Sequence, residues 1–188
     1  MKTAVTVETE FTPNPHSLKF NVNRTLLASG SAYFQTQKEA EKSSPLAAKL
    51  WAIPRVEGIL IGQTFVTVTR NPSLETWASI IPAATKVLQT HLEGGEPVML
   101  PGASTESPAA GAGSEIERKI KQILNERIRP AVARDGGDIL FHGFKNGVVK
   151  LHLQGACSSC PSSMATLKSG VERMLREYVP EVKEVIQV

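Results

Sequence analysis

The chain has 188 residues, of which 41% are hydrophobic and 21% are charged, and its formal net charge is +3 at pH 7. This length fits one large domain or two small ones, with enough apolar residues for a core. So small a charge does not indicate nucleic acid or a membrane surface as partner, and no apolar run approaches the roughly 20 residues that span a bilayer.

The first residues, "MKTAVTVETEFTPNP", have no apolar segment followed by a small-residue cleavage site. A secretory signal is therefore not expected. The sequence predicts a soluble cytoplasmic protein, in which thiols stay reduced.

Residues 1–92 are expected to form an α/β unit. "SLKFNV" alternates as a strand does, and "VEGILIGQTFVTVTR" predicts two strands around Gly62. Ser44 followed by Pro45 is typical of a helix start, so "SPLAAKLWAI" is predicted to be a short helix.

A longer helix is expected to begin after Ser73 and to bend at Pro82. His16 and His91 stand alone in this half, and we expect them at the surface or at helix ends. These residues alone indicate no chemistry for residues 1–92.

Residues 93–113, "EGGEPVMLPGASTESPAAGAG", are dominated by Gly, Pro, Ala and Ser. Such a composition buries too little apolar surface to order itself, so a flexible linker is predicted here. Its "VML" could dock on a domain.

Residues 114–188 predict helix, strand, strand, helix and strand. Ser114 with Glu117 three positions later is a capping-box pattern, and Pro130 should kink this first helix or start a second one. Asn146-Gly147 is a strong hairpin signal. The fold class is therefore α/β, of the α+β type, with two small domains and a mixed three-stranded sheet in the second.

Cys157 and Cys160 are the two cysteines of the chain, and they lie in "GACSSCPSS" between a predicted strand and a predicted helix. Unpaired N–H groups and the positive end of the macrodipole favour thiolates at a helix start. The pair is therefore suited to nucleophilic or metal-binding chemistry.

Three kinds of site remain open for the cysteine pair. A thioredoxin-like redox pair also lies at a helix start, but follows a strand in a βαβ unit. A zinc site would need two more ligands, for which His142 and His152 are near in sequence. An iron–sulfur cluster usually needs four thiolates, so two chains would each donate a pair across a two-fold axis.

The segment 128–182 carries "IRP", "DGGD", "GAC..CPSS" and "TLK.G.E" in this order. This combination resembles the C-terminal domain of NifU-type iron–sulfur proteins, over nearly all of residues 114–188. "TPNP..LKF" at 12–20 resembles the N-terminal domain of the Nfu group.

The resemblance implies a carrier that receives or assembles a [4Fe–4S] cluster and passes it to apo-proteins, and not an enzyme. Cys157 and Cys160 match the family's ligands. The implied partners are a second copy in the cluster-bound state, an upstream assembly scaffold, and iron–sulfur client proteins, which residues 1–92 could recognise.

Asp135 and Asp138 flank two glycines, which are expected to supply the positive φ of a C-cap and turn. We therefore expect turn and cap roles for this carboxylate pair rather than acid–base chemistry. The arginines Arg127, Arg129 and Arg134 are expected to form a solvated helix face.

Overall fold

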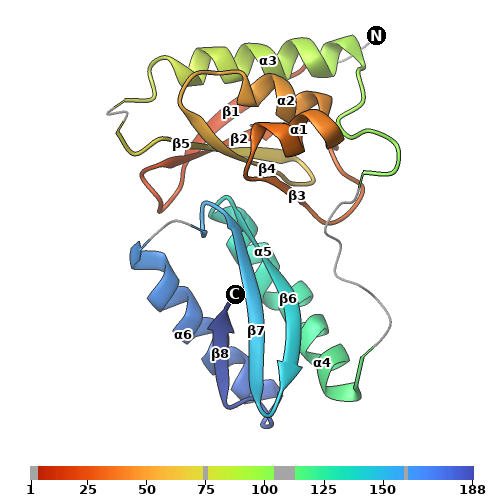
Figure 1. The fold of residues 1–188 in the computed structure, drawn as a ribbon, viewed down its shortest axis with the longest axis vertical. Coiled ribbons are helices and arrows are strands. Elements are labelled where there is room, and N and C mark those ends of the chain that lie inside the picture. Colours follow the sequence, from red (N-terminus) through yellow and green to blue (C-terminus); the bar gives the residue numbers. More distant parts are fainter. Residues whose placement is uncertain (1–3, 74–75, 104–112, 159–160) are drawn as a thin grey trace.

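Two β-sheets organise the chain, one in each of two lobes (Figure 1). The computed structural model describes residues 4–73, 76–103, 113–158 and 161–188, of which 161–166 are described by their helical backbone alone. We call residues 4–103 the N-terminal lobe and 113–188 the C-terminal lobe.

The N-terminal lobe contains a five-stranded antiparallel sheet in the order β1-β2-β5-β4-β3. Its strands are β1 (Val7–Phe11), β2 (Ser17–Val22), β3 (Ala32–Phe34), β4 (Val56–Ile61) and β5 (Phe65–Arg70). The strands predicted in "SLKFNV" and around Gly62 are confirmed. Strand β1 was not predicted; it lies at the sheet edge, where Glu8 and Glu10 discourage pairing with another chain.

Three helices cover one face of this sheet (Figure 1): α1 (Gln37–Ser43), α2 (Pro45–Trp51) and α3 (Ile80–Gly94). The start of α2 is confirmed, because the Ser44 hydroxyl accepts the Ala47 N–H at 3.0 Å and Pro45 takes the first position. The predicted start of the longer helix after Ser73 is wrong. Helix α3 begins at Ile80, so Pro82 lies in the first turn, where its missing N–H has no intrahelical acceptor to lose.

The core of the N-terminal lobe lies between the sheet and these helices. Its largest fully buried side chains are Leu18, Phe20, Leu46, Leu50, Ile59, Ile61, Ile80 and Leu88. Val98 and Met99 also pack against this core, so the predicted linker begins with residues that contact the lobe. Residues 104–112 of the predicted linker lie outside the described residues.

The C-terminal lobe has the predicted order of elements. They are α4 (Glu115–Ile123), the π-helical turn η1 (Leu124–Ile128), α5 (Arg129–Arg134), β6 (Gly137–Lys145), β7 (Val148–Gly155), α6 (Pro161–Tyr178) and β8 (Glu184–Gln187). Strands β6 and β7 pair antiparallel and β7 and β8 pair parallel, which confirms the mixed sheet.

Local signals explain where the elements of this lobe begin and turn. Ser114 and Glu117 form the predicted capping box at the start of α4. The chain widens into a π turn before α5, where Pro130 has no N–H to donate to the preceding turn. Asn146 and Gly147 have φ angles of 53° and 86°, as the predicted hairpin turn requires.

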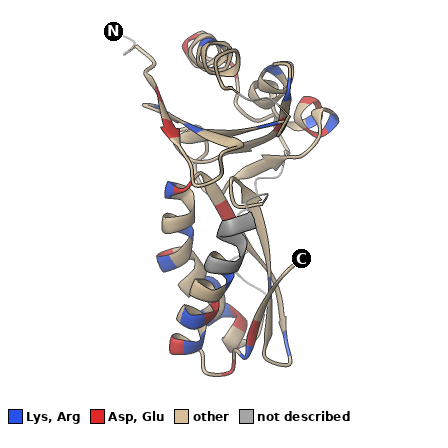
Figure 2. Cartoon of the chain, turned by 90° about the vertical axis from the view of Figure 1, so that its left-hand side faces the viewer, with Lys and Arg blue, Asp and Glu red and all other residues tan. Residues whose placement is uncertain are grey.

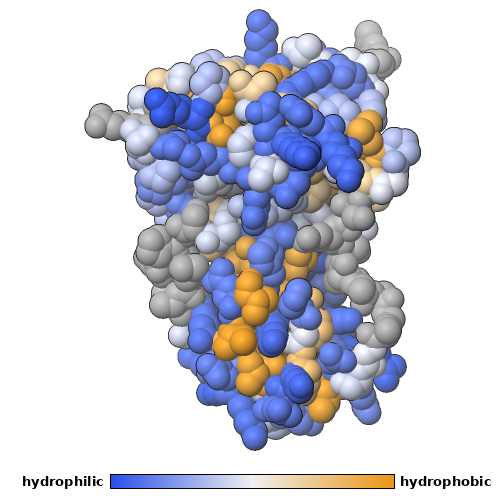
Figure 3. Space-filling model, viewed as in Figure 1, coloured by the Kyte–Doolittle hydropathy of each residue, from blue (hydrophilic) through white to orange (hydrophobic). Residues whose placement is uncertain are grey.

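The helices of the C-terminal lobe pack against its sheet around a second core. This core includes Ile120, Leu124, Val132, Ile139, Val149, Leu151, Val171 and Leu175. Apolar side chains also show at the surface where β7 and β8 meet α6 (Figure 3), around a small gap lined by Leu167, Val185 and Ile186. Basic and acidic residues are interspersed along the helices of this lobe (Figure 2). Among the described residues, no helix combines the length and apolar character needed to cross a membrane.

Candidate functional site

Cys157 lies in the turn between β7 and α6, as the sequence predicts. Its side chain is only 5% exposed and packs in the core of the C-terminal lobe. Cys160 lies outside the described residues. We call residues 155–160 the cysteine loop, of which the structure describes Gly155–Ser158.

Gly155 gives the cysteine loop its shape. Its φ is 63°, a left-handed conformation, and a methyl group on its Cα would lie 2.7 Å from the carbonyl oxygen of Gly136. The Ala156 N–H donates to that same carbonyl at 3.2 Å. The Ser158 N–H and hydroxyl both donate to the Gly155 carbonyl, at 3.1 and 2.8 Å. The loop is therefore held closely against the beginning of β6.

Gly137 provides the space that the thiol occupies. A methyl group on its Cα would lie 2.5 Å from Cys157 Sγ and 3.0 Å from the carbonyl oxygen of Gln154. Only Gly136 of the glycine pair has a positive φ, 76°. The expectation that both glycines supply positive φ is therefore wrong for Gly137.

Asp138, which is buried, and Arg129, which is partly buried, form an ion pair beside the cysteine loop. Arg129 Nε and Nη2 donate to the two carboxylate oxygens at 2.7 and 2.5 Å, and the Ile139 N–H donates at 2.7 Å. The Ser31 hydroxyl of the N-terminal lobe donates to the same carboxylate. The turn role expected for Asp138 and the solvated role expected for Arg129 are therefore wrong. Asp135 does cap α5, as expected.

The N-terminal lobe touches the cysteine loop directly. Asn14 Nδ2 donates to the Ala156 carbonyl at 2.9 Å, in a buried position. The Tyr33 and Ser158 hydroxyls are hydrogen-bonded at 3.1 Å. Sequence reasoning missed both contacts, since Asn14 and Ala156 lie 142 residues apart.

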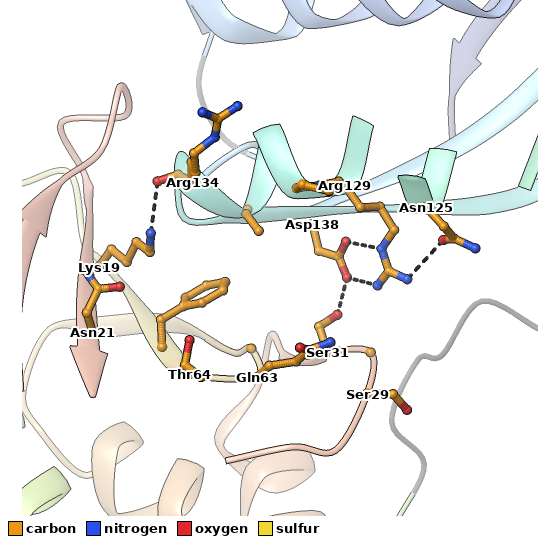
Figure 4. Close-up of a pocket in the computed structure, with 16 residues that line it drawn as sticks. Lys19, Asn21, Ser29, Ser31, Gln63, Thr64, Asn125, Arg129, Arg134 and Asp138 are labelled. Atoms are coloured by element: carbon orange, nitrogen blue, oxygen red, sulfur yellow. Dashed lines mark hydrogen bonds and ion pairs between the residues drawn. The ribbon is translucent and has the colours of Figure 1, made fainter. Parts of the chain in front are cut away.

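A cleft of about 590 Å³ opens between the lobes next to this ion pair (Figure 4). Lys19 lies at one end, where its ammonium donates to the Arg134 carbonyl at 3.2 Å and pairs with Glu10 at 3.2 Å. Arg129 lies at the other end and is paired with Asp138. Lys19 and Arg129, two of the three basic residues that line the cleft with Arg134, thus already have acidic partners.

The zinc alternative finds no support among the described residues. In the described ranges no three His, Cys, Asp or Glu side chains come together as a metal site. His142 is exposed, and His152 Nδ1 is hydrogen-bonded to the Val188 carbonyl at 2.8 Å. His91 is fully buried, so the expected surface position is wrong, but it lies in the last turn of α3, at a helix end as the other expectation had it.

Comparison with known proteins identifies the family of the chain. Residues 120–186 match the NifU-like domain, and residues 7–95 match the N-terminal domain described as "Scaffold protein Nfu/NifU N terminal". The human protein named NFU1 iron-sulfur cluster scaffold homolog, mitochondrial, is 40% identical over 186 residues, covering 97% of this chain and 71% of its own length. The chain belongs to the Nfu family of NifU-like proteins.

Other Nfu proteins match over nearly the same residues. The protein of the same name from Drosophila erecta is 43% identical over 185 residues, which cover 97% of this chain. The chain spans 64% of the length of that Drosophila relative. The cytoplasmic location expected from the sequence is contradicted, because these Nfu relatives are named as mitochondrial proteins.

Two solved structures resemble parts of the chain. A solution structure of a NifU-like protein from Saccharomyces cerevisiae is 28% identical and covers 52% of this chain and 87% of its own, with a TM-score of 0.47. A crystal structure of a Staphylococcus aureus protein is 14% identical and covers 46% of this chain and 99% of its own, with a TM-score of 0.40.

Proposed function

We propose that this protein is an iron–sulfur cluster carrier that binds a [4Fe–4S] cluster between two copies and transfers it to apo-proteins. The observation that carries the proposal is the position of Cys157 in the turn before α6, with Cys160 three residues later in the sequence, within the segment 120–186 that matches the NifU-like domain. The names of the Nfu relatives, which describe cluster scaffolds, support the same role.

The number of cysteines determines how the cluster is held. A [4Fe–4S] cluster takes four thiolates, and each chain supplies two, Cys157 and Cys160. Two copies related by a two-fold axis supply the full set, so cluster binding and homodimerisation are coupled.

Transfer is an exchange of ligands rather than a redox reaction. Each bond between iron and a carrier cysteine breaks as a bond to a client cysteine forms, and the proton of the client thiol passes to the departing thiolate of Cys157 or Cys160. The oxidation states of iron and sulfide do not change. The protein is therefore a carrier and not an enzyme, and its partners are an upstream scaffold and apo iron–sulfur proteins.

The division of the chain supports this role. We keep residues 1–92 as an Nfu-type domain, 93–113 as a linker and 114–188 as the cluster-binding domain. On this division the cluster ligands come from the last domain alone.

Anaerobic reconstitution with iron and sulfide tests the proposal, with Mössbauer spectroscopy and light-scattering mass measured on one sample. We expect a [4Fe–4S] signal and four irons per dimer. Cys157→Ala and Cys160→Ala should each abolish iron binding, whereas Ser158→Ala, which keeps both thiols, should retain it.

A protein that takes up no iron but forms a reversible internal disulfide would overturn the proposal in favour of a thiol–disulfide redox protein. Full iron binding by either cysteine variant would refute the ligand assignment.

A further inference from the structure

The N-terminal lobe covers the cysteine loop on both sides of Cys157. Asn14 bonds the carbonyl of the preceding residue, Ala156, and Tyr33 bonds the hydroxyl of the following residue, Ser158. The side chain of Leu60 lies against Gly155, because a methyl group there would come within 2.5 Å of Leu60 Cδ2.

Several hydrogen bonds join the two lobes. Besides the bonds to the loop, the Ser31 hydroxyl donates to Asp138 and the Lys19 ammonium donates to the Arg134 carbonyl. Polar interfaces between domains of one chain resemble those of transient complexes, and relative motion of the domains is their usual behaviour.

One buried hydroxyl between the lobes is not hydrogen-bonded. Thr67 is fully buried, and its Oγ1 makes no hydrogen bond within the described part of the chain. It lies beside Gly136, since a methyl group on that glycine would be 3.0 Å from Thr67 Oγ1. A buried polar group without a partner weakens the interface and is relieved when water reaches it.

The burial of Cys157 conflicts with a shared cluster. Its side chain is 5% exposed in the docked arrangement of the lobes. A thiolate that binds a cluster together with a second copy must reach the surface of its own chain. Gly155, Ala156 and Ser158, which lie around it, are the residues that the N-terminal lobe contacts.

We propose that the N-terminal lobe and the cysteine loop of a second copy use the same surface, Gly155–Ser158, and exclude one another. The N-terminal lobe covers this surface in the cluster-free monomer and leaves it when two copies bind a cluster. This inference rests on the proposed function, because the second copy is the one that completes the cluster site.

The rate at which the Cys157 thiol reacts in the full-length, cluster-free chain tests whether the N-terminal lobe covers the cysteine loop. In a Cys160→Ser background, Cys157 is the single cysteine, and its rate of reaction with a chromogenic disulfide reagent reports its accessibility. Asn14→Asp keeps the oxygen that accepts the His16 N–H at 3.0 Å but turns a carboxylate oxygen toward the Ala156 carbonyl. We expect the Cys157 rate to rise about tenfold, from one hydrogen bond lost and one repulsion added.

Asn23→Asp is the matched control. Asn23 also accepts a backbone N–H, from Thr6 at 3.0 Å, and donates to a carbonyl, that of Ala4 at 2.9 Å, but all three residues lie within the N-terminal lobe. In Asn23→Asp, the Cys157 thiol should react at the same rate as in the Cys160→Ser parent. Tyr33→Phe removes a single hydroxyl and should raise the rate less than Asn14→Asp does. Equal rates in all variants would overturn the proposal, and circular dichroism verifies that each variant is folded.

The cluster-bound protein provides the second measurement. In the reconstituted dimer, the amide NMR shifts of Ser31 and Tyr33 should move toward their values in cluster-free Asn14→Asp. If the Ser31 and Tyr33 amide shifts in the dimer stay at their values in the cluster-free parent, the proposal is overturned. A chain that binds no cluster would instead refute the proposed function. The Cys157 reaction rates would still test whether the N-terminal lobe covers the cysteine loop.

Discussion

Replacing Gly137 by alanine tests whether the beginning of β6 positions the cysteine thiol. The added methyl group would lie 2.5 Å from Cys157 Sγ, whereas ordinary contacts of this kind begin at 3.4 Å. The thiol must therefore move by about 0.9 Å, the difference between these two distances. The methyl group has little room to avoid the thiol, because its position is also only 3.0 Å from the Gln154 carbonyl oxygen, which belongs to the backbone.

The expected cost follows from overpacking a buried site. Forcing a methyl group into a well-packed core destabilises a protein by about 1–3 kcal/mol. In a domain the size of the C-terminal lobe, each kcal/mol lowers the Tm by about 4–8 °C. We also expect Gly137→Ala to bind less iron on reconstitution, since Cys157 leaves its position.

Gly143→Ala is the matched control on the same strand. A methyl group on Gly143 has no atom within 4 Å, so its free energy of unfolding should stay within about 0.5 kcal/mol of the parent. Thermal unfolding followed by circular dichroism, and iron content after reconstitution, compare the two variants. Equal Tm and equal iron content for both would refute the reasoning, because Cys157 would then not depend on the space at Gly137.

Two further predictions concern stability. Ser114→Ala should lower the free energy of unfolding by about 1 kcal/mol in urea denaturation, because it removes the helix cap of α4. Ser79→Ala should leave it unchanged, because Ser79 makes no capping hydrogen bond. Equal losses in the two variants would contradict the capping role of Ser114. Burial, aided by the Lys49 ammonium and opposed by Glu96, lowers the pKa of His91. The unfolded chain therefore binds the proton more tightly, so stability is fully present above about pH 6.5 and is lost as the pH falls toward the lowered pKa. The urea midpoint should fall between pH 8 and pH 5.5 in the parent and fall less in His91→Gln; identical slopes would exclude His91 as the titrating group.

Local signals in the sequence predicted much of the C-terminal lobe. The capping box at Ser114 and the Asn146-Gly147 turn each depend on residues within a few positions of one another. Such patterns specify backbone geometry without help from the rest of the fold. The turn that holds Cys157 was predicted for the same reason.

Contacts between distant residues were not predictable in this way. The sequence around Asp138 is that of a turn, and only the fold brings Arg129 and the Ser31 hydroxyl to its carboxylate. His91 has no neighbouring ligand in the sequence, and its burial depends on how α3 packs in the N-terminal lobe. Both errors came from residues whose partners lie on other elements.

The "DGGD" segment connects the thiol with the N-terminal lobe. Gly136 lies against Thr67 of the N-terminal lobe, and Asp138 accepts a hydrogen bond from the Ser31 hydroxyl of the same lobe. Gly137, between them, lies against Cys157. A displacement of the N-terminal lobe therefore acts on the residues that adjoin the thiol at the same time as it uncovers Gly155–Ser158. This arrangement explains why the opening of the lobes and the reactivity of Cys157 should change together. A methyl group on Gly137 would instead meet Cys157 and the Gln154 carbonyl oxygen, both in the C-terminal lobe. Gly137→Ala therefore tests the position of the thiol separately from the opening of the lobes.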